Sequence, residues 1–556
     1  MGKKSKQRAK PANRVATGSS RYWPHVVVLL IVVLFGLIRF RLLDTPLERD
    51  EGEYAYAGQL ILQGVPPYQL AYNMKLPGSY AAYALVLAIL GQTPAGIHGG
   101  LLLVNAATTV LVFFLTIRLF GSLAGVVSAA SYGLLSTSPS VLGLAGHATH
   151  FVALCAVGGV LLLLKAVESK RIWLYFWAGV LLGLAFVMKQ PGIFFVFFAG
   201  LYFLWSEWQR AASSQEDSQG KDWRGITLRG GMLSLGAVLP FVITCLILWR
   251  AGVFPRFWFW TFDYARQYGL ALGPLEGARV LWATAPSVVG PGLFLWLIAA
   301  VGVSAIFWDA PARSHRVFLA GFFLFSFLAV CPGFYFRSHY FIVMLPTIAL
   351  LAGVAVAAGV RQFQEHKQTR FWRFVPVLIF VFAFVYSLAE QWDFFFEMDL
   401  VAACQSMYAP NPFPEAPRIA EYIKAHSSPE ARIAVLGSEP EIFFYAQRRS
   451  ATGYIYVYPL MEHQKYASTM QQEMISEIER AEPEFILFIG VPISWVVRPD
   501  SDTRLISWAR NYLQQHYELD GIADILQESQ YRWGEEARAY RPTSPYTVQI
   551  FKRRGN

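Results

Sequence analysis

The stretch that decides the fold is WPHVVVLLIVVLFGLIRFRLL, residues 23–43, which is followed after four residues by Glu48-Arg49-Asp50-Glu51-Gly52-Glu53-Tyr54. The first part is long and apolar enough to cross a bilayer as one helix. The second part then places four carboxylates within six residues at a membrane surface. Ionisable groups are costly near lipid and mark pathways or chemistry where they gather, so the search for function starts at Asp50.

Composition assigns the whole chain to the membrane proteins. Of its 556 residues, 55% are hydrophobic, 16% aromatic and only 15% charged, and the mean hydropathy is +0.38. The net charge of +10 is spread over short loops and tails and forms no single patch, which argues against nucleic acid as a partner. The four cysteines are too dispersed for a disulfide framework or a zinc site.

About eleven membrane spans can be followed along the chain. They are residues 23–43, 95–118, 122–144, 148–166, 172–189, 193–208, 231–250, 281–308, 317–331, 340–360 and 374–391. A shorter apolar segment, residues 77–90, is expected to lie along the membrane interface as a helix, because it is too short to cross. The sequence therefore predicts an all-α polytopic membrane domain.

The distribution of Lys and Arg predicts which way the chain is inserted. A basic tail, residues 1–22, precedes the first span and is expected to stay in the cytoplasm, so that the acidic segment emerges on the outer face. The loops that then fall inside, residues 168–171, 209–229, 309–316 and 361–373, carry 12 of the 24 Lys and Arg of residues 23–391. We expect an integral plasma (inner) membrane protein whose C-terminal part is periplasmic or extracellular.

The apolar pattern of the membrane domain, residues 23–391, ends before a different kind of sequence. Residues 392–417 contain a proline-rich stretch and are interpreted as a linker. Residues 418–556 predict a small α/β domain, with helices at 418–426, 441–448 and 466–481 and strands at 431–436, 454–458, 485–489 and 546–551. No glycine-rich phosphate loop occurs there, so nucleotide binding has no support.

The first outer loop carries the side chains best suited to chemistry. A carboxylate such as Asp50, Glu51 or Glu53 can remove a proton from a hydroxyl, and Lys75 near the headgroups can neutralise a phosphate. Helix N-termini also favour acidic residues, and a lysine beside lipid can simply snorkel, so both interpretations stay open. Lys189 lies at the outer end of another span, and it too either contacts a phosphate or snorkels beside lipid.

Two later outer segments add cations and rings. Arg266 follows the aromatic run of residues 257–264, which forms either an interfacial belt or a wall that stacks on a sugar or isoprenoid. Arg337, His339 and Tyr340 stand at the outer end of a span, and the fork of an arginine suits phosphate. These residues are candidates for binding an anionic substrate.

The order of these segments resembles a known family. Residues 39–121, with Asp50-Glu51 after the first span, Lys75-Leu76-Pro77 before the amphipathic helix and Arg118-Leu119-Phe120-Gly121 after the next span, resemble the GT-C glycosyltransferases. They are most similar to bacterial relatives of protein O-mannosyltransferases and of the aminoarabinose transferase that modifies lipid A. Met188-Lys189-Gln190-Pro191-Gly192 and Arg337-Ser338-His339-Tyr340 are also similar to family blocks, so the resemblance covers about residues 39–360.

The resemblance implies a GT-C fold and the transfer of a hexosyl or pentosyl group, with inversion, from a polyprenyl-phosphate carrier. The acceptor is a hydroxyl of a lipid, glycan or protein on the outer face of the bilayer. Asp50 corresponds to the catalytic base, with Glu51 beside it, and Lys75 to a residue that contacts the carrier phosphate. Glu53 and Tyr54 complete the substrate-binding candidates of this loop. No cofactor is required, and a divalent metal is possible but unsupported.

The chain departs from the family pattern at Gly146-His147-Ala148-Thr149-His150, where many members place a second acid. His147 is interpreted either as a hydrogen-bonding partner of an acceptor or phosphate or as a polar interface residue; His150 is interpreted as the latter. Two histidines three residues apart can bind a metal, but no third ligand is evident, so no metal site is predicted.

Two other classes of function remain as alternatives. A transporter or flippase of lipid-linked sugars would be expected to carry charges at the bilayer midplane and internal repeats. The span interiors here are nearly free of charge, which weighs against transport. A non-catalytic sugar-binding scaffold on the same fold is the other alternative, and the missing second acid keeps it open.

Overall fold

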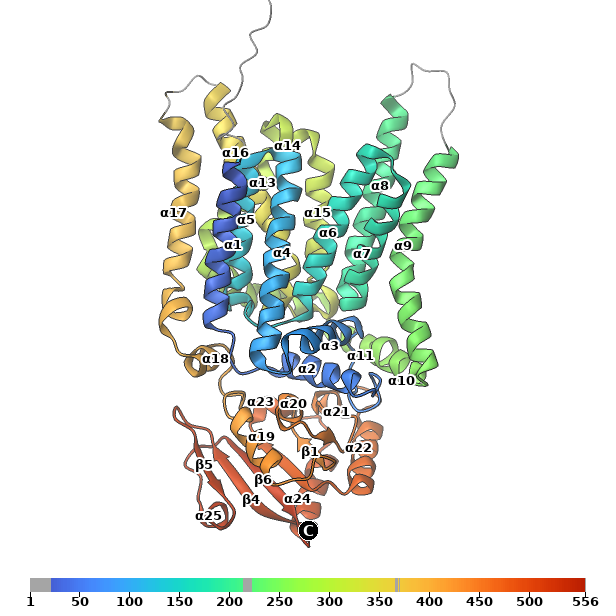
Figure 1. Ribbon diagram of the computed structural model, residues 1–556, viewed down its shortest axis with the longest axis vertical. Coiled ribbons are helices and arrows are strands. Elements are labelled where there is room, and N and C mark those ends of the chain that lie inside the picture. Colours follow the sequence, from blue (N-terminus) through green and yellow to red (C-terminus); the bar gives the residue numbers. More distant parts are fainter. Residues whose placement is uncertain (1–21, 214–222, 366–368, 370, 556) are drawn as a thin grey trace, which may run out of the picture.

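The computed structural model describes residues 22–213, 223–365, 369 and 371–555. A bundle of long helices forms one end of the molecule and a small sheet domain forms the other (Figure 1). The tail predicted to be cytoplasmic lies, except for Tyr22, outside the described residues. The division into domains at residues 22, 391 and 417 stays a prediction, although the change of architecture is visible in Figure 1.

Each of the eleven predicted spans coincides with a helical segment. The helices are α1 (Trp23–Arg41), α4 (Pro94–Phe120), α5 (Ser122–Thr137), α6 (Ala148–Ser169), α7 (Ile172–Met188), α8 (Ile193–Ser213), α9 (Trp223–Arg250), α12 (Pro274–Val289) with α13 (Leu293–Trp308), α15 (Arg316–Leu328), α16 (Leu345–Glu365) and α17 (Val375–Ala389). Among the described residues, eight segments are both long and apolar enough to cross a membrane, and α5, α7 and α15 are shorter apolar helices. The expected polytopic membrane domain is confirmed.

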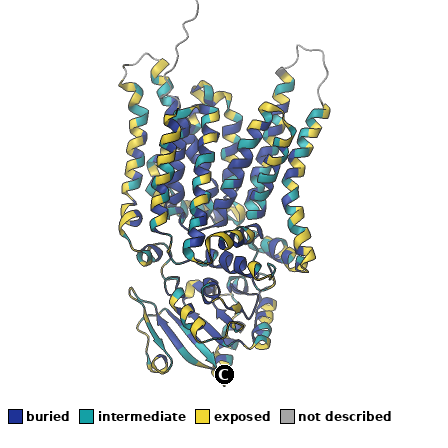
Figure 2. Ribbon diagram, viewed as in Figure 1, coloured by how far each residue is buried: buried dark blue, intermediate teal, exposed yellow. Residues whose placement is uncertain are grey.

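Close helix packing in the bundle depends on small residues. A Cβ added at Gly179 of α7 would lie 2.2 Å from the carbonyl oxygen of Leu233 in α9, and one at Gly302 of α13 would lie 2.0 Å from that of Leu351 in α16. Small residues allow such backbone approach in a bilayer. α16 is mostly buried, whereas α9 and α17 lie at the edges with exposed apolar faces, as Figure 2 shows.

Short helices cover the end of the bundle that faces the sheet domain. α2 (Arg49–Leu62) and α3 (Gly78–Leu90) lie across the bundle direction (Figure 1), as predicted for residues 77–90. α2 starts with a capping box, in which Glu48 accepts from the backbone N–H of Glu51 and Glu51 accepts from that of Glu48. At the same level, α10 (Phe254–Trp258), the π-helix η4 (Phe259–Tyr264) and α11 (Ala265–Gly269) form the second of the loops predicted to lie outside, called the second outer loop below.

The C-terminal domain is a six-stranded sheet in the order β2-β1-β3-β6-β4-β5. Its strands are β1 (Arg432–Leu436), β2 (Arg449–Ser450), β3 (Phe485–Gly490), β4 (Tyr517–Asp524), β5 (Gln530–Trp533) and β6 (Thr547–Arg553). β1 pairs in parallel with β2 and β3, and β6 joins β3 and β4 antiparallel. The main helices are α19 (Ala416–Ala425), α20 (Glu441–Ala446), α22 (Ala467–Ala481) and α24 (Arg504–His516), with short turns α21 (Tyr458–Met461), α23 (Pro492–Trp495) and α25 (Glu535–Ala539).

The strand predicted at residues 454–458 is wrong. The run Tyr-Ile-Tyr-Val-Tyr alternates as a strand would, but the segment has no strand partner in the described sheet and leads into α21. Residues 454–457 are all buried instead, in the core that this domain shares with the first outer loop. The predicted linker also contains the helix α18 (Leu400–Tyr408), and β4, β5 and α24 were not predicted.

The C-terminal domain and the first outer loop share one hydrophobic core. Tyr54, Tyr56 and Tyr68 belong to the same buried cluster as the sheet residues Ile433 and Leu487. Backbone contacts reinforce this packing: the N–H of Tyr72 donates to the carbonyl of Gly453 over 2.7 Å. This joint packing fixes the acidic end of α2 directly against the C-terminal domain.

Candidate functional site

Asp50 and Lys75 form an ion pair at the first turn of α2. The ammonium of Lys75 lies 2.7 Å from Oδ1 of Asp50 and 2.6 Å from Oε2 of Glu53. α2 presents both carboxylates on neighbouring turns, and the loop before α3 carries the lysine back to them. The structure therefore brings together three of the residues predicted in the first outer loop.

The surroundings hold Lys75 in place. Its ammonium lies 4.5 Å from the ring centre of Tyr54 and 5.5 Å from that of Tyr456 in the C-terminal domain. Glu53, fully buried, also accepts hydrogen bonds from the hydroxyl of Tyr80 and the amide of Asn73. These contacts leave the lysine one well-defined position beside Asp50.

The charges of the pair keep both partners ionised. Burial favours a neutral Asp50, but the charge of Lys75 and the neighbouring His147 hold the pKa of Asp50 well below its usual range. Burial likewise opposes the ammonium, yet Asp50 and Glu53 raise the pKa of Lys75 well above its usual value. Burial raises the pKa of Glu53, against the effect of Lys75. Asp50 is the carboxylate of this group best placed to accept a proton.

A cavity of about 380 Å³ opens beside the ion pair. Four predicted cations line it: Lys75, Lys189, Arg266 and Arg337. Lys189 also lies over the ring of Tyr340, with its ammonium 4.3 Å from the ring centre. The cavity is thus a hollow with clustered positive charge and the Asp50 carboxylate on its wall, at the end of the bundle that faces the C-terminal domain.

Glu51 does not face this cavity. Its carboxylate, 1% exposed, accepts from the backbone N–H of Gly146 over 2.5 Å and lies 3.0 Å from Nε2 of His98. Burial opposes its charge, but these hydrogen bonds and His98 lower its pKa. Glu51 ties the start of α2 to the segment before α6, so its predicted catalytic role gains no geometric support.

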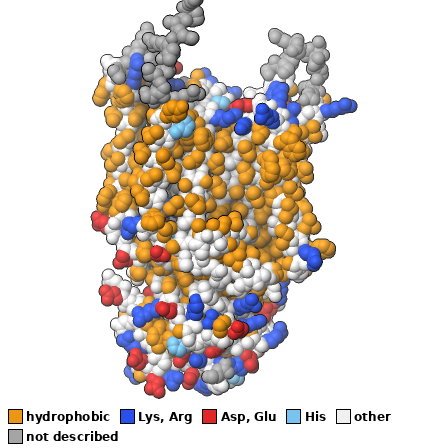
Figure 3. Space-filling model, in the orientation of Figure 1, with side chains coloured by type: hydrophobic (Ala, Val, Ile, Leu, Met, Phe, Trp, Pro, Cys, Tyr) orange, Lys and Arg blue, Asp and Glu red, His pale blue; other side chains and the backbone are white. Residues whose placement is uncertain are grey.

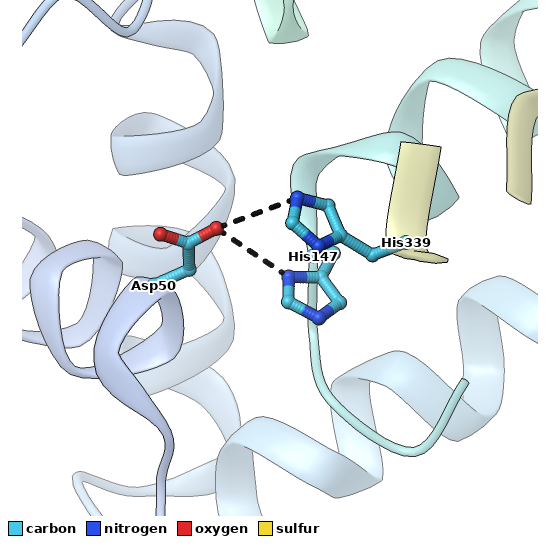
Figure 4. A group of neighbouring side chains, drawn as sticks. All are labelled: Asp50, His147 and His339. Carbon is cyan, nitrogen blue, oxygen red and sulfur yellow. Dashed lines mark ion pairs between the residues drawn. The ribbon is translucent and has the colours of Figure 1, made fainter. Parts of the chain in front are cut away.

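The structure joins His147 to His339 and Asp50 (Figure 4). Nδ1 of His147 lies 3.6 Å and Nε2 of His339 3.7 Å from Oδ2 of Asp50, and the two rings stack with centres 4.1 Å apart. His150 lies elsewhere, with Nδ1 3.4 Å from the amide of Asn105. Burial and the neighbouring His147 and Lys189 lower the pKa of His339 well below its usual value, so its imidazole is neutral.

A second cavity, of about 520 Å³, adjoins the first. Asp50, Arg337 and His339 line both cavities, whereas Glu48 and His147 line only the second. Asp50 therefore stands on the wall between two hollows.

Several residues of the site were missed by the sequence analysis. Tyr456, Tyr458 and Glu462 reach the first cavity from the C-terminal domain, and the hydroxyl of Tyr456 lies 3.3 Å from Oδ1 of Asp50. Arg49 also lines both cavities and bonds Glu439 at 3.0 Å. The tyrosine-rich run was visible in the sequence but was interpreted as a strand, and no local signal connected it to Asp50.

Part of the chain matches a known protein family. Residues 75–249 match the family model described as dolichyl-phosphate-mannose-protein mannosyltransferase. No curated protein sequence matches the chain.

Solved structures extend the similarity over nearly the whole chain. ArnT from Cupriavidus metallidurans bound to undecaprenyl phosphate is 13% identical with a TM-score of 0.58, covering 95% of this chain and 98% of that one. The archaeal oligosaccharyltransferase AglB from Archaeoglobus fulgidus, in complex with an inhibitory peptide and a dolichol-phosphate, is 12% identical with a TM-score of 0.55, covering 93% and 75%. The chain therefore has the GT-C fold, and residues 75–249 match the dolichyl-phosphate-mannose-protein mannosyltransferase family.

Proposed function

We propose that this protein is a membrane glycosyltransferase that moves a sugar from a polyprenyl-phosphate carrier to an acceptor hydroxyl on the outer face of the membrane. The observation that carries the proposal is the Asp50–Lys75 ion pair, which opens onto a hollow lined by Lys189, Arg266 and Arg337. A base beside a cluster of cations suits a reaction in which a hydroxyl loses a proton while a phosphate leaves.

Asp50 acts as the base in this proposal. Its ionised carboxylate accepts the proton of the acceptor hydroxyl as that oxygen forms a bond to the anomeric carbon. The bond between that carbon and the phosphate oxygen breaks, and its electron pair leaves with the phosphate. Attack opposite the leaving group inverts the anomeric configuration. No general acid is needed, because a phosphate departs without protonation.

Lys75 stabilises the departing phosphate. Two of its three ammonium N–H donors are directed to Asp50 and Glu53, which leaves one donor for a phosphate oxygen. Arg337, Arg266 and Lys189 add charge on the same wall. Their attraction grows as charge builds on the phosphate, so it favours the transition state over the ground state.

The carrier is proposed to be a polyprenyl phosphate that enters sideways from the bilayer. The first cavity is lined largely by apolar and aromatic groups, among them Phe262, Ala329 and Pro332, which suit the first isoprene units. Support also comes from the two similar proteins described above, whose structures hold undecaprenyl phosphate and a dolichol-phosphate. The sugar is a hexosyl or pentosyl group, and the acceptor is a lipid, glycan or protein.

The proposed orientation places the N-terminus in the cytoplasm and the C-terminal domain outside. Figure 3 shows a broad hydrophobic band with Lys and Arg gathered at the end of the bundle opposite the C-terminal domain. An excess of Lys and Arg is characteristic of cytoplasmic loops. The orientation of this plasma-membrane protein then agrees with an outer-face reaction.

Sugar transfer by the purified protein in liposomes tests the proposal. With labelled polyprenyl-phosphate sugars and membrane extracts as acceptor, Asp50→Asn should lower the initial rate by about 10²-fold or more, because it removes the base. The matched control is Asp263→Asn, an exposed carboxylate in the second outer loop, which should leave the rate unchanged. A transporter, flippase or scaffold would be indifferent to Asp50→Asn, and transfer at the wild-type rate by this variant contradicts the proposal.

A further inference from the structure

We infer that Asp50, His147 and His339 form a binding site for a divalent transition-metal ion of the zinc type. The three side chains come from the start of α2, from the residue before α6 and from the short helix η7 (Ser338–Val343). Each offers one ligand atom, and the three atoms lie within 4.8 Å of one another (Figure 4). The inference goes beyond the proposed transfer, which requires no metal.

The distances from Asp50 suit a metal ion, and the two stacked imidazole rings must turn for both nitrogens to point at it. Two ligands bonded at about 2.1 Å to a tetrahedral zinc ion stand roughly 3.4 Å apart. Oδ2 of Asp50 stands 3.6 Å from the nitrogen of His147 and 3.7 Å from that of His339. Both distances are longer than a hydrogen bond between two heavy atoms. They are closer to the distance between two ligand atoms of one zinc ion. The spacing leaves room for an ion between the carboxylate oxygen and the two nitrogens.

The unmet polar atoms of His147 point to a ligand. The residue is 1% exposed, yet neither ring nitrogen has a hydrogen-bond partner within the part of the chain that the structure describes. A buried imidazole without a partner is costly, because it has lost its hydrogen bonds to water. An ion bound at Nδ1 removes that cost at the nitrogen that faces Asp50.

The carboxylate of Asp50 is divided between two partners. Oδ1 accepts the ammonium of Lys75, whereas Oδ2 faces the imidazoles. Glu48, whose Oε1 lies 3.7 Å from Nδ1 of His147, adds a further acid next to the site. Lys189 and Arg337 bring opposing charge, but Lys189 lines only the first cavity. Arg49 and Arg337 line the second cavity together with Glu48 and Asp50, so a cation there depends on direct coordination by Asp50 and the two imidazoles.

The ligand set favours zinc over magnesium or calcium. Imidazole nitrogens prefer zinc and other late transition metals, while magnesium and calcium prefer an all-oxygen shell. All three residues line the second cavity, so coordination positions are open toward it. Three protein ligands with an open position characterise sites where a metal binds an exchangeable oxygen ligand.

Zinc binding by the full-length protein in detergent tests the inference. The protein is stripped with a chelator, dialysed against zinc and analysed by mass spectrometry for metal content. We expect close to one equivalent per chain, and at least tenfold weaker binding in Asp50→Asn, His147→Gln and His339→Gln. His426→Ala is the matched control, since this exposed histidine lies in the C-terminal domain and its loss should change nothing.

Two further measurements guard against misfolding of the variants. Zinc should raise the thermal midpoint of the wild type and fail to raise that of His147→Gln. His147→Asp should still bind an ion but with a preference moved toward manganese or magnesium, because a carboxylate replaces an imidazole.

A wild type that binds zinc no better than the three variants would overturn the inference. So would equal zinc stabilisation of wild type and His147→Gln. Because these experiments contain no sugar donor, their failure leaves the proposed transfer untouched, and failure of the transfer assay leaves the metal site untouched.

Discussion

At the scale of single residues, Asp50 contacts two groups of side chains, one on each of its carboxylate oxygens. One carboxylate oxygen bonds Lys75, which lies nearby in the sequence, and the other faces His147 and His339, which come from distant segments. The sequence could single out Asp50 and Lys75 because charged residues are rare at a membrane surface. It could not pair His147 with His339, since only the folded bundle brings their helices together.

Removing the cation from this pair should damage both stability and transfer. Lys75→Met keeps the length of the side chain but leaves the half-buried Asp50 and the buried Glu53 without their shared partner. We expect a loss of about 3 kcal/mol in the free energy of unfolding, since breaking a buried ion pair strands the remaining charge. Thermal unfolding in detergent measures it, with Lys465→Met as an exposed control; equal midpoints for both variants would contradict the role of Lys75.

The raised pKa of Glu48 makes the free energy of unfolding depend on pH. Burial, and then the charge of Asp50, raise the pKa of Glu48 from 4.5 to about 7. The folded protein therefore holds this proton more tightly than the unfolded chain, so its contribution is complete below pH 4.5 and is lost as the pH rises through about 7.

The variant Glu48→Gln should remove this pH dependence. We expect the wild type to lose stability between pH 5 and pH 8, by at most about 3 kcal/mol, and the variant to lose less. Thermal midpoints of both proteins at the two pH values measure the difference. A variant that loses as much as the wild type would show that Glu48 is not responsible.

At the scale of elements, α2 depends on a glycine to meet the C-terminal domain. A Cβ at Gly52 would lie 2.5 Å from the backbone nitrogen of Glu441 in α20. We expect Gly52→Val to separate the two parts and expose residues 392–417 to limited proteolysis. Gly200→Val is the control, because no atom lies within 4 Å of a Cβ added there. Equal cleavage of both variants would contradict this account of the interface.

The elements themselves were predictable to different degrees. Long apolar runs predicted the spans because every residue of a membrane helix faces lipid or other apolar helices. The small sheet was harder: β4 contains Glu518, Asp520 and Gly521, residues that are depleted in strands, and it depends on pairing with β5 and β6. The segment 454–458 had the opposite problem: its residues are strand formers and residues 454–457 are buried, but they lie in the core shared with α2 and form no strand of the sheet.

At the scale of the whole molecule, the orientation in the membrane is open to a direct experiment. We expect a protease added to intact spheroplasts to cleave the C-terminal domain, because the basic loops hold the other end of the bundle in the cytoplasm. A tagged cytoplasmic protein serves as the control for leakage. Cleavage only after the membrane is disrupted would place the domain inside and contradict the outer-face reaction.

The C-terminal domain contributes part of the site. The sequence predicts no site residue in this domain. Tyr456, Tyr458 and Glu462 complete the wall of the first cavity, so the domain is structurally part of the site. Contacts between residues so far apart in the sequence leave no local signal. The lining residues from the membrane domain were therefore predicted, and those from the C-terminal domain were not.

The position of the carrier phosphate tests the central claim most directly. A cryo-electron microscopy structure of the protein in nanodiscs with a polyprenyl phosphate should show the phosphate in the first cavity, bonded to Lys75 and Arg337 and next to Asp50. A phosphate bound at the opposite end of the helical bundle, or anywhere remote from Lys75, would contradict the account.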